Sequence, residues 1–290
     1  MRHRTLPALV VGTILALGFL ASGLSADTAS PPADGERFLF SARWNGIPVA
    51  RAELVITPEH GTPQRTVHLR GKARTNAFLD LFWRMRNSFD ATVPIDPTTP
   101  GRFYLAQNEN SRRRQTWIER DDAHARLIGR LERPGRKTRH GEAELHSTLH
   151  DPASIAYLVK HLPGDFDTPR TYEVFEGWKV YTMKVTPEGE EDIYLMGRRW
   201  RARKLRLGLA LVPRTEVQRR KNKQPKIQHA ELWISADDER VLLRMVAGTW
   251  WGRVTIAITG REPAGVPAPA LLHAPGRAAR AVLEDDAARL

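Results

Sequence analysis

Alternation of apolar and polar residues in short runs is the feature that most constrains the fold of this chain. The clearest run is RARKLRLGLALVPR, which begins at Arg201 and places four leucines on one face of an extended strand. They are Leu205, Leu207, Leu209 and Leu211. Similar runs, bounded by turn-forming residues, recur from Glu36 to Thr259, roughly a dozen in all. The pattern predicts a mostly β domain, either a single antiparallel curved sheet or an open, barrel-like sheet.

One short helix is expected within this series, over about residues 151–162 in HDPASIAYLVKHLPG. Asp151 can accept hydrogen bonds from first-turn amides, and Pro152 suits the first helical position. Apolar residues then follow with helical spacing until Pro163-Gly164 ends the helix.

Three further segments give local predictions. Asn45-Gly46 indicates a hairpin, and Pro48 indicates that its loop is longer than two residues. The segment NAFLDLFWRMRNSFDATVPID has helical spacing at its start and predicts a short helix or bend followed by a strand; the spaced residues are Phe78, Leu81, Phe82 and Met85. The segment RPGRKTRHGEAE, from Arg133 to Glu144, is predicted to be a polar loop.

The first residues are typical of a secretory signal. Arg2 and Arg4 precede a nearly uninterrupted apolar stretch from Leu6 to Ala26, so we expect export to the periplasm, with cleavage near Ala26 or retention as an uncleaved inner-membrane anchor. Residues 27–35 are then a linker, 36–260 the β-rich domain and 261–290 a tail rich in Pro and Ala. The tail composition predicts disorder, with a docking segment as the alternative. The chain has no Cys, which excludes disulfides and cysteine catalysis.

The net charge of the chain is +12. Without Arg2 and Arg4, 43 basic residues stand against 33 acidic ones, so the exported part carries +10. This excess either makes a solvated basic surface or attracts an anionic envelope partner such as lipid headgroups or an acidic polymer. Nucleic acid fits the charge but not the export signal. The cations gather in residues 198–206 and 219–226, which we expect at opposite ends of one strand.

Candidate reactive residues each have a plainer structural interpretation. The acidic run Asp237 to Glu239 lies between two apolar runs and is typical of a turn. His146 and His150 have the spacing of metal ligands on a helix but precede the predicted helix, which favours a solvated loop. Ser154 lacks a nucleophile elbow and is expected to bond at the helix start. We therefore predict no catalytic residue, metal or cofactor, with hydrolase activity as a minor alternative.

Four ordered segments form a recognisable series: GERFLFSARWNGIPVARAELVI, NSFDATVPIDP, DPASIAYLVKHLPG and LWISADDERVLLRMVAGTWWGRVTIAIT. Together they resemble an uncharacterised bacterial family, domain of unknown function 3108, over about residues 36–260. Val241 stands where the family often has a proline. The resemblance implies an exported, β-rich protein, and it brings no catalytic residue or substrate with it.

The function expected from these features is that of a non-enzymatic protein of the Gram-negative envelope that binds an amphipathic or anionic component such as lipid. Apolar side chains of the sheet would line its interior, and arginines at a strand end would meet the headgroup. The residues are Leu205, Leu207, Leu209 and Ile256, with Arg199, Arg201 and Arg203. Peripheral membrane contact is part of this expectation. The alternative is a scaffold or assembly factor that contacts a partner protein through its basic loops and C-terminal tail.

Overall fold

A computed structural model describes residues 35–59, 66–95, 99–161, 167–212, 229–249 and 252–263 of the chain. Its strands are β1 (Glu36–Trp44), β2 (Ile47–Glu59), β3 (Thr66–Thr75), β4 (Met85–Pro94), β5 (Arg102–Glu109), β6 (Arg112–Asp121), β7 (Arg126–Arg133), β8 (Arg136–Glu144), β9 (Leu149–His150), β10 (Arg170–Phe175), β11 (Val180–Leu195), β12 (Arg198–Leu211), β13 (His229–Ser235), β14 (Leu242–Thr249) and β15 (Gly252–Pro263). The helices are α2 (Ala77–Asp80), α3 (Pro152–His161) and the 3-10 turn η1 (Asp122–His124).

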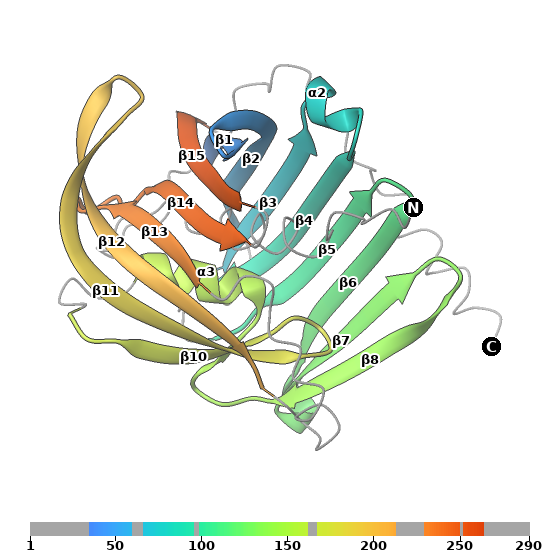
Figure 1. Ribbon diagram of the computed structural model, residues 1–290. Coiled ribbons are helices and arrows are strands. Elements are labelled where there is room, and N and C mark those ends of the chain that lie inside the picture. The colour runs from blue at the N-terminus through green and yellow to red at the C-terminus, as the bar shows by residue number, and fades with distance from the viewer. Residues whose placement is uncertain are drawn as a thin grey trace.

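All of these strands belong to one open sheet, in the order β8-β7-β6-β5-β4-β3-β2-β1-β15-β14-β13-β12-β11-β10-β9 (Figure 1). Neighbours are antiparallel except for β9 and β10, which pair in parallel at one edge. The first and last strands, β1 and β15, lie side by side at its centre. The predicted curved, open sheet is therefore confirmed, with a single parallel pair as the departure from it.

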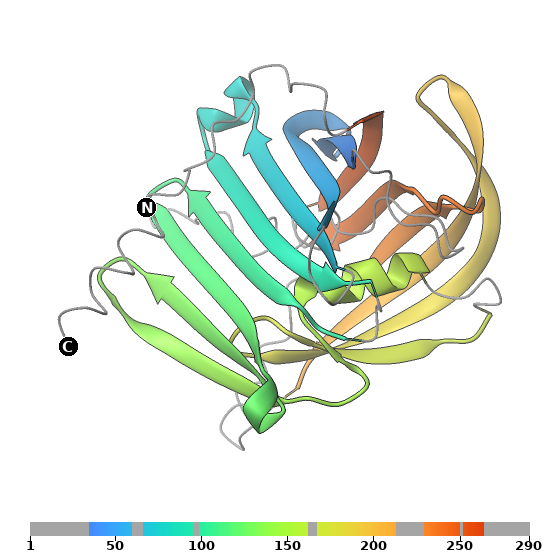
Figure 2. The same ribbon diagram turned by 180° about the vertical axis from the view of Figure 1, so that it is seen from behind.

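The sheet curves around α3, which lies within its concave side (Figures 1 and 2). A helix that is apolar all round belongs in a core rather than on a surface, and the side chains from Ala153 to Val159 are all buried. Asp151 caps the helix as predicted: its Oδ1 accepts hydrogen bonds from the backbone N–H groups of Ala153 at 2.7 Å and Ser154 at 3.1 Å. Its Oδ2 accepts a bond from the N–H of Gly101 at 3.0 Å, which ties the helix to the chain entering β5.

The two ends of the curved sheet pack against each other at three glycines, Gly129, Gly141 and Gly177. The turn between β10 and β11 rests on the concave face of β6, β7 and β8. A Cβ placed on Gly129 would lie 2.0 Å from the carbonyl oxygen of Gly177, and one on Gly141 would lie 2.4 Å from the Cα of Trp178. Gly177 itself approaches the side chain of Thr116. Backbone at such distances leaves no room for a side chain, so glycine is required on both sides of this contact. We call it the closing seam.

Several local predictions need correction. Asn45 and Gly46 form a two-residue turn with positive φ angles of 46° and 87°, because a bulge between Ala42 and Arg43 accommodates Pro48. Most of the polar loop predicted from Arg133 to Glu144 is instead the edge strand β8 (Arg136–Glu144), whose backbone pairs with β7, and only residues 134–135 form a turn. Strand β15 continues to Pro263, three residues past the predicted boundary at residue 260.

Other predictions lie outside the described residues. They are the signal or anchor in residues 1–26, most of the linker, the tail beyond residue 263, and the second basic cluster at 219–226. Among the helices that the structure does describe, none has the length and apolar character needed to span a bilayer.

Candidate functional site

The three arginines predicted to meet a headgroup lie on β12, in the hairpin that this strand forms with β11. Each one is paired with a carboxylate of β11. Arg199 contacts Asp192, and Glu190 accepts bonds from Arg201 at 3.0 Å and Arg203 at 3.4 Å. Hydrogen bonding to Arg199 lowers the pKa of the Asp192 carboxyl, which favours its charged form. These pairs offset the positive charge of the hairpin.

The four predicted lining residues are parts of the packed interior. Leu205, Leu207 and Ile256 are buried in the core, and Leu209 is partly buried against it. Core positions of this kind are filled by protein atoms at close to crystal density. The ligand-binding role of these residues stays a prediction.

The acidic run and the two histidines lie in a turn, in a buried strand and in a polar contact. The acidic run from Asp237 to Glu239 lies in the turn between β13 and β14, where Asp237 accepts a bond from the N–H of Arg240 at 3.2 Å. The prediction of a solvated loop is wrong for His150, which is fully buried in β9, and burial lowers the pKa of its imidazole. His146 contacts Glu173 at 3.2 Å. Within the described ranges, no group of three or more His, Cys, Asp or Glu side chains could hold a metal ion.

An exposed apolar corner is the surface feature that sequence reasoning missed. It lies at α2, where Phe78, Leu81 and Phe82 are 56%, 78% and 68% exposed. Ile47 is 50% exposed and lies close to α2. Its neighbour in the chain, Pro48, accepts a hydrogen bond through its carbonyl oxygen from the side chain of Asn76 at 2.6 Å. Large apolar side chains that cluster in solvent mark sites of protein or membrane contact. We call these four residues the apolar corner.

The helical spacing of Phe78, Leu81, Phe82 and Met85 predicted a short helix or bend followed by a strand, and α2 and β4 confirm this prediction. The spacing did not indicate which of these side chains are exposed. In the structure the helix is only four residues long, and Met85 is buried in β4 while Leu79 is the helix residue packed against the core. The three spaced side chains therefore face outwards.

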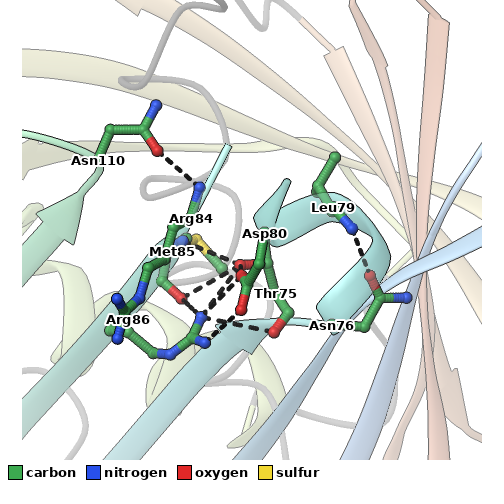
Figure 3. Close-up of polar contacts among 8 residues, drawn as sticks. All are labelled: Thr75, Asn76, Leu79, Asp80, Arg84, Met85, Arg86 and Asn110. Carbon is green, nitrogen blue, oxygen red and sulfur yellow. Dashed lines mark hydrogen bonds and ion pairs between the residues drawn. The ribbon is translucent and has the colours of Figure 1, made fainter. Parts of the chain in front are cut away.

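A polar network holds the apolar corner in place (Figure 3). Asn76 caps α2 by accepting a hydrogen bond from the N–H of Leu79 at 2.9 Å. Asp80 accepts bonds from Arg86 of β4 at 3.1 and 2.5 Å, and a further one from the Thr75 hydroxyl. The Thr75 hydroxyl oxygen in turn accepts from the N–H of Met85 at 2.9 Å. The Asp80 carboxylate is thus bonded to both β3, through Thr75, and β4, through Arg86.

The electrostatics of this network favour its charged form. Hydrogen bonding to Arg86 holds the pKa of the Asp80 carboxyl below its usual value, and the charges of Arg86 and Arg84 add to the effect against the opposing influence of burial. Arg84 is itself exposed beside the corner, and its backbone exchanges hydrogen bonds with Asn110 in the turn between β5 and β6. The exposed Arg112 and Arg113 follow that turn directly. Cations therefore flank the apolar corner.

A second apolar tip lies at the turn between β11 and β12. Tyr194 and Met196 are exposed there, beside Arg198 and Arg199. Both views show this hairpin and α2 projecting at the same end of the curved sheet (Figures 1 and 2). One end of the molecule thus carries two separate projections, each combining exposed apolar side chains with arginines.

Comparison with known proteins identifies a family and a fold. Residues 39–259 match the model of the family described as Protein of unknown function (DUF3108). No curated protein matches the chain. A β-barrel-like protein of domain of unknown function DUF1849 from Brucella abortus superposes with a TM-score of 0.51 at 10% identity, covering 79% of this chain and 97% of that one. This similarity supports the fold alone.

Two other solved structures are less similar. A protein from Bacteroides fragilis described as exported, with a YmcC-like fold, gives a TM-score of 0.38 at 9% identity over 80% of this chain and 97% of its own. A protein from Parabacteroides distasonis described as a lipoprotein gives 0.37 at 8% identity, with the same coverage.

Proposed function

Since the chain belongs to the DUF3108 family, which has no known activity, we propose from its site that it is an exported, non-enzymatic protein of the Gram-negative envelope that binds lipid. The apolar corner is the observation that carries this proposal. It would enter the boundary between headgroups and acyl chains, while the flanking arginines contact anionic headgroups.

Burial of the corner in lipid is energetically favourable. Complete burial of a large apolar side chain is worth about 1.5–3 kcal/mol, and Phe78, Leu81 and Phe82 project together. Because the network around Asp80 already orders this segment, less conformational entropy is lost on binding. The exposed Arg84 adds electrostatic attraction at an anionic surface, where a basic residue contributes about 1 kcal/mol.

A bilayer fits the corner better than a protein groove does. The exposed apolar residues belong to α2 and its flanks, and α2 projects at one end of the sheet (Figures 1 and 2). Amphipathic elements that lie in the membrane interface combine aromatic or leucine side chains with basic residues in this way. The turn between β11 and β12 would supply a second contact through Tyr194 and Met196.

Vesicle co-sedimentation tests the proposal. The full chain is expressed in a Gram-negative host, purified as processed there, and mixed with vesicles of phosphatidylglycerol and phosphatidylethanolamine or of phosphatidylcholine alone. We expect binding to the anionic vesicles, and at least tenfold weaker binding for the double variant Phe78→Ser/Phe82→Ser. Ile128→Ser is the matched control, because Ile128 is 39% exposed on β7, away from α2.

All variants keep the same N-terminus, so any contribution of that segment is common to them. Equal binding of the double variant and the wild type would overturn the proposal. Absence of vesicle binding together with specific crosslinks from the corner to an envelope protein would favour a scaffold or assembly role instead.

A further inference from the structure

The concave face of β6, β7 and β8 carries a cluster of arginines next to the closing seam. Arg114 of β6 and Arg133 of β7 each lie one residue beyond the paired residues Gln115 and Glu132. They therefore share the face that bears Thr116 and Leu131, on which the seam packs. Arg139 of β8 pairs with Leu131 and belongs to the same face. Three strands thus direct guanidinium groups to one place.

The β10–β11 turn lies against this arginine cluster. The Arg139 guanidinium lies over the Trp178 ring, 4.5 Å from its centroid, and Lys179 lies over the same ring at 4.5 Å. Glu176 of this turn accepts a hydrogen bond from the Tyr181 hydroxyl at 3.3 Å. Residues distant in the chain are therefore brought together by the closure of the sheet.

Like charges dominate the surroundings of Arg133. The strand register pairs it with Arg136, and cations directly opposite each other on a sheet are destabilising. Burial lowers the pKa of the Arg133 guanidinium, and the charges of Arg139, Arg114 and Arg136 lower it further. Its Nε is buried, and no described residue accepts a hydrogen bond from it. A buried donor without an acceptor costs about 1–3 kcal/mol, and more when it is charged.

The carboxyl groups near this cluster, Glu109 and Glu176, both have raised pKa values. Burial raises the pKa of Glu109, against the opposing effects of a hydrogen bond from Asn87 and of the charges of Arg114 and Arg112. Burial likewise raises the pKa of Glu176, against Lys179, the Tyr181 hydroxyl and Arg114. Both acids are therefore held towards their neutral forms. An additional anion would provide an acceptor for the buried Nε of Arg133.

We propose that Arg114, Arg133 and Arg139 form an anion-binding site at the closing seam, which takes a phosphate or carboxylate group, with Trp178 as its apolar wall. Guanidinium groups suit this ligand because they donate parallel hydrogen bonds to planar or tetrahedral oxyanions. In one respect the inference rests on the proposed function, since it takes the anionic group from an envelope amphiphile. Anion binding itself is independent of the apolar corner and is measured separately.

Isothermal titration of the full chain with defined probes tests the site. The probes are dodecyl phosphate below its micelle concentration, inorganic phosphate, and dodecyl maltoside as the uncharged amphiphile. The variant is Arg133→Gln. Its matched control is Arg130→Gln, since Arg130 lies on the same strand, pairs with Glu132 and stacks on Trp117, on the opposite face.

We expect dodecyl phosphate to bind the wild type and Arg130→Gln alike, and Arg133→Gln at least tenfold more weakly. If inorganic phosphate binds as tightly as dodecyl phosphate, and its binding depends equally on Arg133, the site is assigned to free phosphate. If inorganic phosphate binds more weakly, the site is assigned to an amphiphile headgroup. Equal affinities in all three proteins, or equal binding of dodecyl maltoside, would overturn the site.

A stability measurement separates this role from a structural one. Without anion, Arg133→Gln should unfold at a higher temperature than wild type, because it removes a partly buried cation from among like charges. With dodecyl phosphate, the wild type should gain more in melting temperature than the variant. A variant that melts lower without anion would show that Arg133 serves the fold and would contradict the proposal. Vesicle binding through the apolar corner should be unchanged in Arg133→Gln, so the two proposals can fail separately.

Discussion

Arg86 holds Asp80 through two parallel hydrogen bonds, from Nη1 to Oδ1 at 3.1 Å and from Nη2 to Oδ2 at 2.5 Å (Figure 3). This two-point contact joins the end of α2 to β4 and keeps three large apolar side chains in solvent. Such paired bonds between charged groups are geometrically specific as well as strong. The exposed position of the apolar corner is therefore fixed by this polar contact together with the packing of Leu79 against the core.

Removing the charge of Asp80 should loosen the apolar corner. We expect Asp80→Asn to lower the free energy of unfolding by about 1–2 kcal/mol, since a charge-assisted contact is replaced by a weaker one. Amide exchange at residues 77–82 should become faster than in the wild type. Asp90→Asn is the control, because the exposed Asp90 is paired with the partly buried His68 at 2.8 Å rather than with an arginine. Unchanged exchange at the corner in Asp80→Asn would contradict this role.

The same contact predicts a dependence of stability on pH. The folded pKa of Asp80 is lowered, so its contribution is present above the unfolded pKa of about 3.9 and is lost as the pH falls through the folded pKa. Urea unfolding at pH 7 and at pH 3 should therefore show a smaller loss of stability on acidification in Asp80→Asn than in the wild type. An equal loss in both proteins would count against the contact.

Glu176 should behave in the opposite way. Burial raises its folded pKa, so its favourable contribution is present below the unfolded pKa of about 4.3 and is lost as the pH rises through the folded pKa. Glu176→Gln keeps a side-chain oxygen for the Tyr181 hydroxyl but carries no charge. We expect it to be more stable than the wild type at pH 8 and similar to it at pH 4, by urea midpoint. A lower midpoint at pH 8 would refute this.

Substitution at the closing seam should destabilise the whole sheet. In Gly129→Ala, the new Cβ would lie 2.0 Å from the backbone oxygen of Gly177, which cannot give way without moving the β10–β11 turn. Overpacking of this kind costs about 1–3 kcal/mol. Gly208→Ala in β12 is the control, since its nearest neighbours would lie at 4.0 Å. Thermal unfolding should show a clear loss for the first variant and little change for the second.

The end of the folded domain can also be tested. Arg261 of β15 donates a hydrogen bond from its Nε to Glu36 of β1 at 2.8 Å and contacts Glu239 at 2.5 Å. A chain that ends at Gly260 should therefore melt lower than one that ends at Pro263. The chain ending at Pro263 should match the full length, if the tail adds nothing to the fold. Equal melting of the two truncated chains would move the boundary back to residue 260.

Much of the architecture follows from local patterns that act within one segment. Alternation in β12 and the cap at Asp151 required only neighbouring residues, and both were predicted. The edge strand β8 was missed because its side chains are mostly exposed and polar, so its pairing with β7 depends on the backbone. The turn at Asn45 was predicted with the wrong length, since the bulge beside Pro48 depends on how two strands pair.

The candidate sites were less accessible to sequence reasoning because they depend on contacts across the chain. Spacing alone could not indicate that Phe78, Leu81 and Phe82 face solvent, since that orientation is set by Asp80 and Arg86. Arg114, Arg133 and Arg139 lie on the consecutive strands β6, β7 and β8, and their convergence depends on the register of these strands, on the face against which the β10–β11 turn packs. The sequence prediction placed a binding site on β12 because basic residues are concentrated there. In the structure, carboxylates of β11 pair with these residues.

The central claim is that the apolar corner enters a lipid surface, and a fluorescent reporter at Leu81 tests it most directly. The chain has no Cys, so Leu81→Cys and Ile128→Cys each offer a single labelling site for an environment-sensitive dye. On phosphatidylglycerol-containing vesicles, we expect the dye at residue 81 to shift to shorter wavelength and to be quenched by nitroxide-labelled lipid, while the dye at residue 128 does neither. Unchanged emission at residue 81 on vesicles that bind the protein would contradict the claim.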